Sequence, residues 1–224
     1  MEPSPAEAPA GVSPRFWSLL VAEPLRRQDV VDVGTGAGRL ALALAPHCRH
    51  VLGLDRDAAA IEEATRHAAA RGLRNTEFVV MDAEKAGDYR GLATGWTTPG
   101  LIVAHLCVSD AIIEASRRSL ERGSPLAFVA FHADQWRETG RRSRFAYDED
   151  QARRVLGEHG FAIEHLEVER EVQHFDSVEA ALAAAIGVQE RWRADGRWFH
   201  YVRFLEEGGR TLTRSHLIVK ARRT

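Results

Sequence analysis

The chain has few cysteines and no large excess of charge of either sign. Its 224 residues include only two cysteines, Cys48 and Cys107, which lie far apart and show neither metal-ligand nor redox spacing. This argues against a disulfide scaffold or a structural zinc site and fits a reducing cytosol, and we expect no bound metal. The formal net charge of −2 gives no global attraction to nucleic acid or to acidic membranes.

Long apolar segments are also missing. No segment approaches the roughly 20 continuous apolar residues of a membrane span. Residues 1–14 have neither the basic start nor the apolar centre of a signal peptide. We therefore expect a cytoplasmic protein without a membrane partner. Hydrophobic residues make up 45% and charged residues 28% of the chain, which is typical of a globular domain.

The prolines and glycines of residues 1–13 predict a flexible tail, and we expect residues 14–224 to form a single domain. Pro14 can begin a short helix over residues 15–22, because proline is favoured in the first turn of a helix. The aromatic side chains of Phe16 and Trp17 on this helix are expected to be exposed.

Strands and helices alternate from residue 29 onward. Short apolar runs predict strands over 29–33, 50–54, 77–80, 101–104, 125–131, 161–172 and 212–221. Helical spacing and capping residues, among them Asp57 and Ser109, predict helices over 38–45, 57–71, 109–121, 148–159 and 177–194. The alternation predicts an α/β fold with a seven-stranded, mostly parallel, doubly wound sheet and helices on both faces. The long interval before the last strand predicts that this strand is antiparallel.

A glycine turn follows the first predicted strand. The sequence there is Val33-Gly34-Thr35-Gly36-Ala37-Gly38. Glycine lets the backbone turn sharply and approach a ligand more closely than a Cβ would permit. In an open α/β sheet, the carboxyl end of this strand lies beside the point where ligands bind.

Acidic residues end the next two strands. Asp55 follows the second strand and can accept hydrogen bonds from both hydroxyls of a ribose. Asp82 follows the third strand and can accept one from an adenine amino group. Three consecutive strand ends that each offer a suitable group predict a cofactor containing adenosine.

These segments resemble the three cofactor motifs of class I methyltransferases that use S-adenosylmethionine (SAM), over about residues 29–131. The resemblance implies SAM as the cofactor, with Gly34 and Gly36 lining its methionine moiety, Asp55 at the ribose, and Asp82 with Ala83 at the adenine. It also implies the antiparallel seventh strand that is characteristic of this family. The complete set of expected cofactor-binding residues is Asp32, Gly34, Thr35, Gly36, Gly38, Asp55, Arg56, Asp82, Ala83 and His105.

A dinucleotide-binding domain is the main alternative for the glycine turn. Its fingerprint is G-x-G-x-x-G, in which a helix N-terminus holds a pyrophosphate. Arg39 occupies the position of the third glycine of that fingerprint. Since SAM has no pyrophosphate and does not need that geometry, the sequence favours SAM over NAD.

His105 is the candidate catalytic residue at the end of the fourth strand, because imidazole titrates near working pH. A histidine that only bonds to the loop backbone is the alternative. We interpret Cys107 as a small packing residue and not as a nucleophile. The Asn/Asp-Pro-Pro-aromatic run of amino-methyltransferases is missing here, so this strand end does not identify the acceptor.

Two later segments, about residues 132–147 and 175–210, are expected on the substrate side. In the first, His132, Trp136, Arg141 and Arg142 predict recognition of an anionic or planar acceptor. The alternative is a solvated basic loop in which Trp136 is tucked into the surface and Glu138 is a counter-charge to the arginines.

The second segment carries Trp198, Phe199 and His200, and His200 is a further candidate substrate residue. Its aromatic residues could form a lid together with Phe16 and Trp17. The alternative is a small satellite core, because large aromatic side chains are usually buried.

The sequence therefore predicts a SAM-dependent methyltransferase that acts on a small molecule. An RNA methyltransferase is the alternative, because clusters of arginine and aromatic residues could hold phosphates and stack on bases. A SAM-binding protein without catalytic activity is the third possibility. The oligomeric state cannot be read from the sequence.

Overall fold

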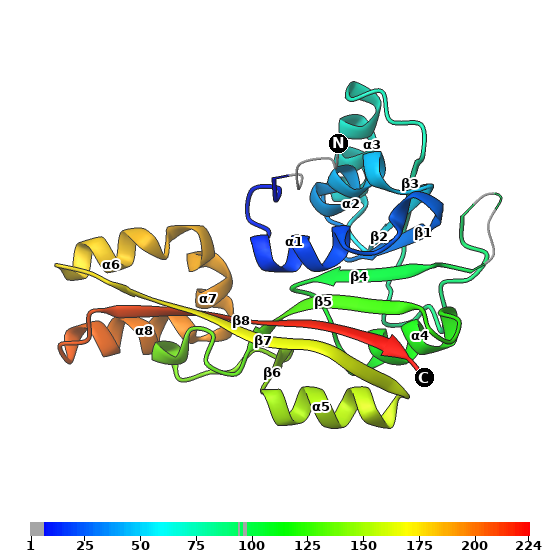
Figure 1. Ribbon diagram of the computed structural model, residues 1–224. Coiled ribbons are helices and arrows are strands. Elements are labelled where there is room, and N and C mark those ends of the chain that lie inside the picture. Colours follow the sequence, from blue (N-terminus) through cyan, green and yellow to red (C-terminus); the bar gives the residue numbers. More distant parts are fainter. Residues whose placement is uncertain (1–6, 94, 96–97) are drawn as a thin grey trace. The chain divides into compact units, whose positions relative to one another are not determined.

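The computed structural model describes residues 7–93, 95 and 98–224 (Figure 1). The chain divides into two compact units. The first unit comprises Met1–Val129, Glu149–Leu166 and Ile218–Thr224, and the second comprises Ala130–Asp148 and Glu167–Leu217. Three strands, β5, β7 and β8, contribute residues to both units.

The sheet has the strand order β3-β2-β1-β4-β5-β8-β7. Strands β1 to β5 pair in parallel, and the C-terminal strands are antiparallel. The predicted fold class is therefore confirmed, with one additional two-residue strand, β6, beside β5. The strands are β1 (Asp29–Val33), β2 (His50–Asp55), β3 (Thr76–Val80), β4 (Leu101–His105), β5 (Pro125–His132), β6 (Ala146–Tyr147), β7 (Phe161–His174) and β8 (Thr211–Arg223).

Helices cover both faces of the sheet in the first unit (Figure 1). All five residues of β1 are buried, as expected of a short apolar strand that is covered on both faces. One face carries α1 (Pro14–Val21), α2 (Arg39–Leu44) and α3 (Ala58–Ala70), with short 3₁₀ turns at Leu25–Arg27 and Ala45–His47. The other face carries α4 (Asp110–Ser119) and α5 (Glu149–Glu158).

The helix predicted after Pro14 is confirmed, but its aromatic residues are not exposed. Phe16 is 0% and Trp17 is 3% exposed, and both belong to the core between α1, α2 and the sheet. The two residues lie with Leu20 on one face of α1, and the helix buries this face. The expected exposure was wrong, and these two side chains cannot contribute to a lid.

The two predicted helix caps differ in outcome. Asp57 caps α3, since its carboxylate accepts hydrogen bonds from the backbone N–H groups of Ala59 and Ala60. Ser109 stands at the start of α4 but makes no capping bond with its side chain, so this prediction was wrong. Its hydroxyl is buried and has no partner among the described residues, and α4 begins on the backbone bond from Ile113 to the Ser109 carbonyl oxygen.

The second unit differs most from the prediction. The single helix expected over 177–194 is broken into α6 (Val178–Ala184), a 3₁₀ turn at Ile186–Val188 and α7 (Gln189–Asp195). Gly187 lies in that turn, and glycine weakens a continuous helix. A helix that was not predicted, α8 (Arg197–Glu206), follows the left-handed Gly196 that ends α7.

A hydrophobic cluster holds the helices of the second unit together. Trp192 is its largest member and is 0% exposed, and its ring centre lies 5.2 Å from that of Trp136 and 5.5 Å from that of Tyr201. The satellite core considered for this segment is therefore confirmed for Trp198, which packs against the cluster. It is wrong for Phe199, which is 70% exposed. None of the helices in the described ranges is long and apolar enough to cross a membrane.

The cluster predicts a large stability difference between two aromatic residues of the second unit. We expect Trp192→Ala to lower the free energy of unfolding by about 3–5 kcal/mol, because it leaves a cavity. Phe199→Ala is the matched control and should change it by less than about 0.5 kcal/mol. Urea denaturation followed by circular dichroism measures both, and equal effects would contradict the packing described here.

Candidate functional site

The glycine turn at the end of β1 has a backbone that requires glycine. Gly34 and Gly36 have φ angles of +67° and +54°, in the left-handed region. A Cβ on Gly34 would collide with Cys107, whereas a Cβ on Gly36 would meet no atom within 4 Å. Gly34 therefore allows close packing below the turn, and Gly36 borders open space.

Cys107 packs against the turn from the end of β4. Its thiol donates a hydrogen bond to the Val33 carbonyl oxygen, at 3.0 Å. Burial raises the pKa of this thiol to about 12, so that it stays protonated at neutral pH. Both observations support the interpretation of Cys107 as a packing residue.

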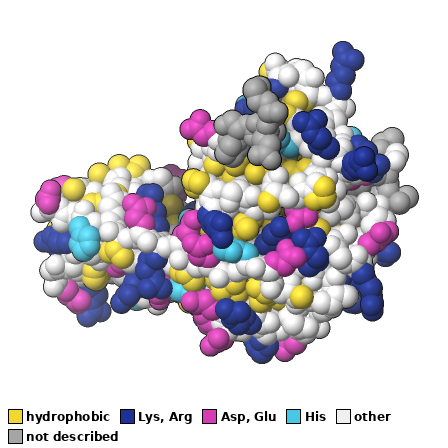
Figure 2. Space-filling view, in the orientation of Figure 1, with side chains coloured by type: hydrophobic (Ala, Val, Ile, Leu, Met, Phe, Trp, Pro, Cys, Tyr) yellow, Lys and Arg dark blue, Asp and Glu magenta, His cyan; other side chains and the backbone are white. Residues whose placement is uncertain are grey.

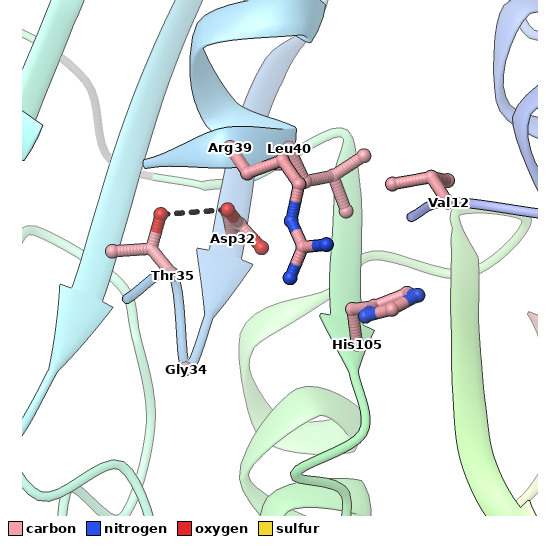
Figure 3. A pocket seen from close by; sticks show the side chains of 7 residues that line it. All are labelled: Val12, Asp32, Gly34, Thr35, Arg39, Leu40 and His105. Carbon is pink, nitrogen blue, oxygen red and sulfur yellow. Dashed lines mark hydrogen bonds between the residues drawn. The ribbon is translucent and has the colours of Figure 1, made fainter. Parts of the chain in front are cut away.

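Asp32 connects the two sides of the glycine turn. Its carboxylate accepts hydrogen bonds from the Thr35 hydroxyl, at 2.7 Å, and from the Ala41 N–H, at 3.1 Å (Figure 3). The residue is 1% exposed. Burial raises the pKa of Asp32 to about 7, since the loss of hydration outweighs the two hydrogen bonds.

Asp55 holds the turn from the neighbouring strand. The Gly36 N–H donates to one carboxylate oxygen of Asp55, at 2.9 Å, and the Asp57 N–H donates to the other, at 3.0 Å. The Thr35 N–H also donates to the Leu54 carbonyl oxygen. The acid at the end of β2 is thus in direct contact with the glycine turn, as the spacing of the motifs suggested.

Asp82 and Ala83 follow β3, next to the end of β2. The Met81 N–H donates to the Asp55 carbonyl oxygen, which fixes the two strand ends side by side. Asp82 forms an ion pair with Lys85, at 3.2 Å, and the hydrogen bond from Lys85 lowers the pKa of its carboxyl group. Arg56, which is exposed, adds positive charge near Asp82.

His105 ends β4, the strand that pairs with β1 on the other side from β2. Its ring is half-buried and its centre lies 6.2 Å from that of Phe16. Leu106 then turns the chain with a φ of +63°, a costly conformation for a residue with a side chain. Such strain is typical of functional sites.

A small pocket lies at the glycine turn in the first unit (Figure 3). Four of the expected cofactor residues line it: Asp32, Gly34, Thr35 and His105. Val12, Arg39 and Leu40 complete the lining and were not expected there. Arg39 could have been found from its place directly after the turn, whereas nothing in the sequence marks Val12.

Gly38 has a packing role in this structure. A Cβ there would lie 3.1 Å from the Ala64 side chain of α3 and 3.2 Å from Leu42 of α2. The residue thus lets α2 approach α3 closely.

Among residues 7–93, 95 and 98–224, no group of three His, Cys, Asp or Glu side chains could hold a metal ion.

The expected substrate residues lie in the second unit. His132 is 5% exposed, and its Nδ1 atom accepts the Asp134 N–H, at 3.2 Å, and lies 3.0 Å from the Ser215 hydroxyl. Trp136 packs against the aromatic cluster with the guanidinium groups of Arg191 and Arg197 each 5.9 Å from its ring centre.

The two arginines of the same segment are exposed but bonded within the second unit. Arg141 donates to the Asp195 carbonyl oxygen, and Arg142 contacts the carboxylate of Asp148. Glu138 does not serve as their counter-charge in these contacts, since it accepts hydrogen bonds from the threonine residues at the start of β8. His200 is exposed on α8, and the substrate roles of all these residues stay predictions.

Residues 30–123 match the family model described as a methyltransferase domain. Among curated relatives, the aklanonic acid methyltransferase DauC of Streptomyces sp. (strain C5) is 39% identical over 72 residues, which are 30% of this chain and 32% of DauC. An uncharacterized RNA methyltransferase of Lactobacillus johnsonii is 32% identical over 75 residues, which are 33% of this chain and 17% of that protein. The chain thus spans a third or less of these relatives.

Solved structures resemble the chain over nearly its whole length. The YcgJ protein of Bacillus subtilis has a TM-score of 0.71 at 15% identity, and the match covers 93% of this chain and 98% of YcgJ. Magnesium protoporphyrin IX methyltransferase (ChlM) of Synechocystis, solved with bound S-adenosylhomocysteine, has a TM-score of 0.61 at 16% identity over 94% of this chain and 80% of ChlM. At these identities the likeness concerns the fold.

The buried carboxyl group of Asp32 predicts a specific pH dependence of stability. Because its pKa is raised on folding, its contribution is fully present below about pH 4 and is lost as the pH rises through about 7. We expect the free energy of unfolding to fall over this window by about 2–4 kcal/mol relative to Asp32→Asn. The exposed Asp150→Asn on α5 is the control and should keep the wild-type slope; an unchanged slope in Asp32→Asn would contradict the assignment.

Proposed function

We propose that this chain is a class I, Rossmann-like methyltransferase that binds SAM at the glycine turn and transfers its methyl group to a small-molecule acceptor. The observation that carries the proposal is the 2.9 Å hydrogen bond between the Gly36 N–H and the Asp55 carboxylate. It holds Asp55, the acid that we propose for the ribose, against the turn that borders open space. Both features are needed to hold an adenosine cofactor across the ends of β1 and β2.

The residues present suit the parts of SAM. Each oxygen of Asp55 accepts one backbone N–H and retains a second acceptor position, so that the carboxylate can still take two ribose hydroxyls. Val80, at the end of β3, is 52% exposed and offers apolar surface to a base beside Asp82. We infer that Asp82 and Ala83 contact the adenine, and that Arg56 borders it.

SAM carries an activated methyl group on a sulfonium, and this group moves by in-line displacement. The contribution of the protein is then to position the two reactants and to exclude water. A base is needed only when the acceptor arrives protonated. His105 lines the pocket at Gly34 and is our candidate for that role.

A small-molecule acceptor agrees best with the surface charge and with DauC, which by its name methylates aklanonic acid. On the face shown in Figure 2, basic and acidic side chains of the described residues are interspersed and form no continuous basic tract. Binding of RNA depends mainly on such tracts.

An RNA acceptor is the second candidate because several relatives, including the Lactobacillus johnsonii protein, are named RNA methyltransferases. Binding of RNA that weakens steeply with salt would favour it over a small molecule. Absence of SAM turnover across a broad panel of acceptors would instead favour a SAM-binding protein without catalytic activity.

Asp55 provides the test of the cofactor site. We expect Asp55→Ala to weaken SAM binding by about 1–3 kcal/mol, because charge-assisted hydrogen bonds are lost. Calorimetry measures this, with Glu62→Ala on the exposed side of α3 as a control that should retain wild-type affinity. Binding of NAD without binding of SAM by the wild-type protein would refute the proposal.

Arg141 and Arg142 provide the test of the acceptor side. If they bind an anionic acceptor, alanine substitutions should lower kcat/KM by the equivalent of about 1.5–3 kcal/mol and leave SAM affinity unchanged. Arg203→Ala, an exposed arginine on α8, is the control. Trp136→Ala should instead lower stability, because that ring packs in the cluster. Full activity in both arginine variants would show that these side chains do not contact the acceptor.

A further inference from the structure

Arg39 places a cation at the wall of the pocket. It forms no close ion pair with any residue that the structure describes, but its charge acts on Asp32, which lines the same pocket. Figure 3 shows its guanidinium group between Asp32 and His105. An arginine in this position offers a fork of N–H donors that matches a carboxylate.

The N-terminal segment holds this guanidinium group in place. Its Nη1 atom donates to the carbonyl oxygens of Ala10 and Gly11, at 3.3 and 3.5 Å. The Nε and Nη2 donors have no partner among the described residues, so they are available to a ligand. Val12, the next residue, is 6% exposed, lines the pocket and anchors the segment in the core of the first unit.

The pocket combines groups of opposite charge in a small space. Asp32 supplies a carboxyl group and Arg39 supplies a cation, and the glycine turn at Gly34 lies between the strand and the helix that carry them. One oxygen of Asp32 accepts both of its hydrogen bonds, and the other accepts none from the described residues. An α-amino acid head group, which has an ammonium and a carboxylate on one carbon, is complementary to this pair.

The pocket lies where the proposed orientation of SAM brings the amino-acid end of the cofactor. The acids proposed for adenine and ribose stand at the ends of β3 and β2, and the strand order continues through β1 to β4. A ligand whose adenosine lies on the first two strand ends reaches β1 and β4 with its other end. The pocket is lined by residues that follow or end these two strands, Gly34 and His105.

We propose that Arg39 binds the α-carboxylate of the amino-acid end of SAM, and that residues 10–12 position its guanidinium group for this contact. The inference rests on the proposed function, because it takes SAM as the ligand. In this arrangement the N-terminal segment is a part of the cofactor site, and Arg39, directly after the glycine turn, binds the cofactor.

Two neutral thioethers that differ in this end of the molecule test the inference by calorimetry. S-adenosylhomocysteine has the amino-acid group, and 5′-methylthioadenosine lacks it. We expect Arg39→Ala to raise the dissociation constant of S-adenosylhomocysteine about ten- to a hundredfold, as for the loss of a hydrogen-bonded charge. The dissociation constant of 5′-methylthioadenosine should change less than about twofold, within the usual range for a surface substitution.

Three further variants sharpen the comparison. Arg39→Lys keeps the charge and should retain part of the affinity for S-adenosylhomocysteine. Arg66→Ala removes an exposed arginine of α3 and should bind both compounds like the wild type. Gly11→Ala places a Cβ against the Nη1 atom of Arg39, so it should displace the guanidinium group and lower the affinity for S-adenosylhomocysteine alone.

The outcomes separate this inference from the proposed function. Equal losses for both compounds in Arg39→Ala would show a structural role and overturn the inference, as would no loss for either. Wild-type protein that binds 5′-methylthioadenosine as tightly as S-adenosylhomocysteine would also overturn it, while leaving the adenosine site in place. Wild-type protein that binds neither compound would overturn the proposed function together with the inference.

Discussion

The candidate site depends on one buried carboxylate, that of Asp32. It binds the hydroxyl of Thr35 inside the glycine turn and the N–H of Ala41 in the helix that follows, so it connects strand, turn and helix. The left-handed backbone at Gly34 and Gly36 is thereby held in one arrangement. Asp55 completes this support from the neighbouring strand. The hydrogen bonds of the protein itself therefore specify the shape of the turn, and such preorganisation lowers the entropy cost of binding a ligand.

Most of the glycine turn and the strands around it in the first unit could be predicted, because the residues that specify them lie close together in the sequence. The strand β1 was predicted with its observed bounds, and the glycine turn follows it within a few residues. Parallel pairing then brings the ends of β2 and β3 together. The proximity of Asp55 and Asp82 therefore follows from the predicted sheet alone. Val12 was missed at the pocket because its place depends on the path of the N-terminal segment, which no periodicity in the sequence specifies. Arg39, in contrast, directly follows the turn and could have been found there.

The aromatic residues could not be placed from the sequence for a different reason. Whether a tryptophan or phenylalanine is buried depends on partners that are distant in the chain. Phe16 meets the core of the first unit, and Trp192 meets Trp136 and Tyr201, whereas Phe199, within the same helix as Tyr201, faces solvent. The break at Gly187 and the helix α8 likewise follow from packing around this cluster, which overrides local helical spacing.

The burial of Asp32 also has a cost that a purely structural residue would avoid. A carboxyl group with its pKa near 7 lowers the stability of the folded chain at neutral pH, and an apolar side chain would not. An apolar residue, however, could accept neither the Thr35 hydroxyl nor the Ala41 N–H, and it would bring no charge to the pocket that Arg39 shares. Local costs of this kind persist in proteins where a site requires them. The same reasoning applies to the left-handed Leu106, which turns the chain directly after His105. Asp32 and Leu106 are thus two costly features at adjacent strand ends, and the cation of Arg39 lines the pocket between them. They distinguish this edge of the sheet from one shaped by stability alone.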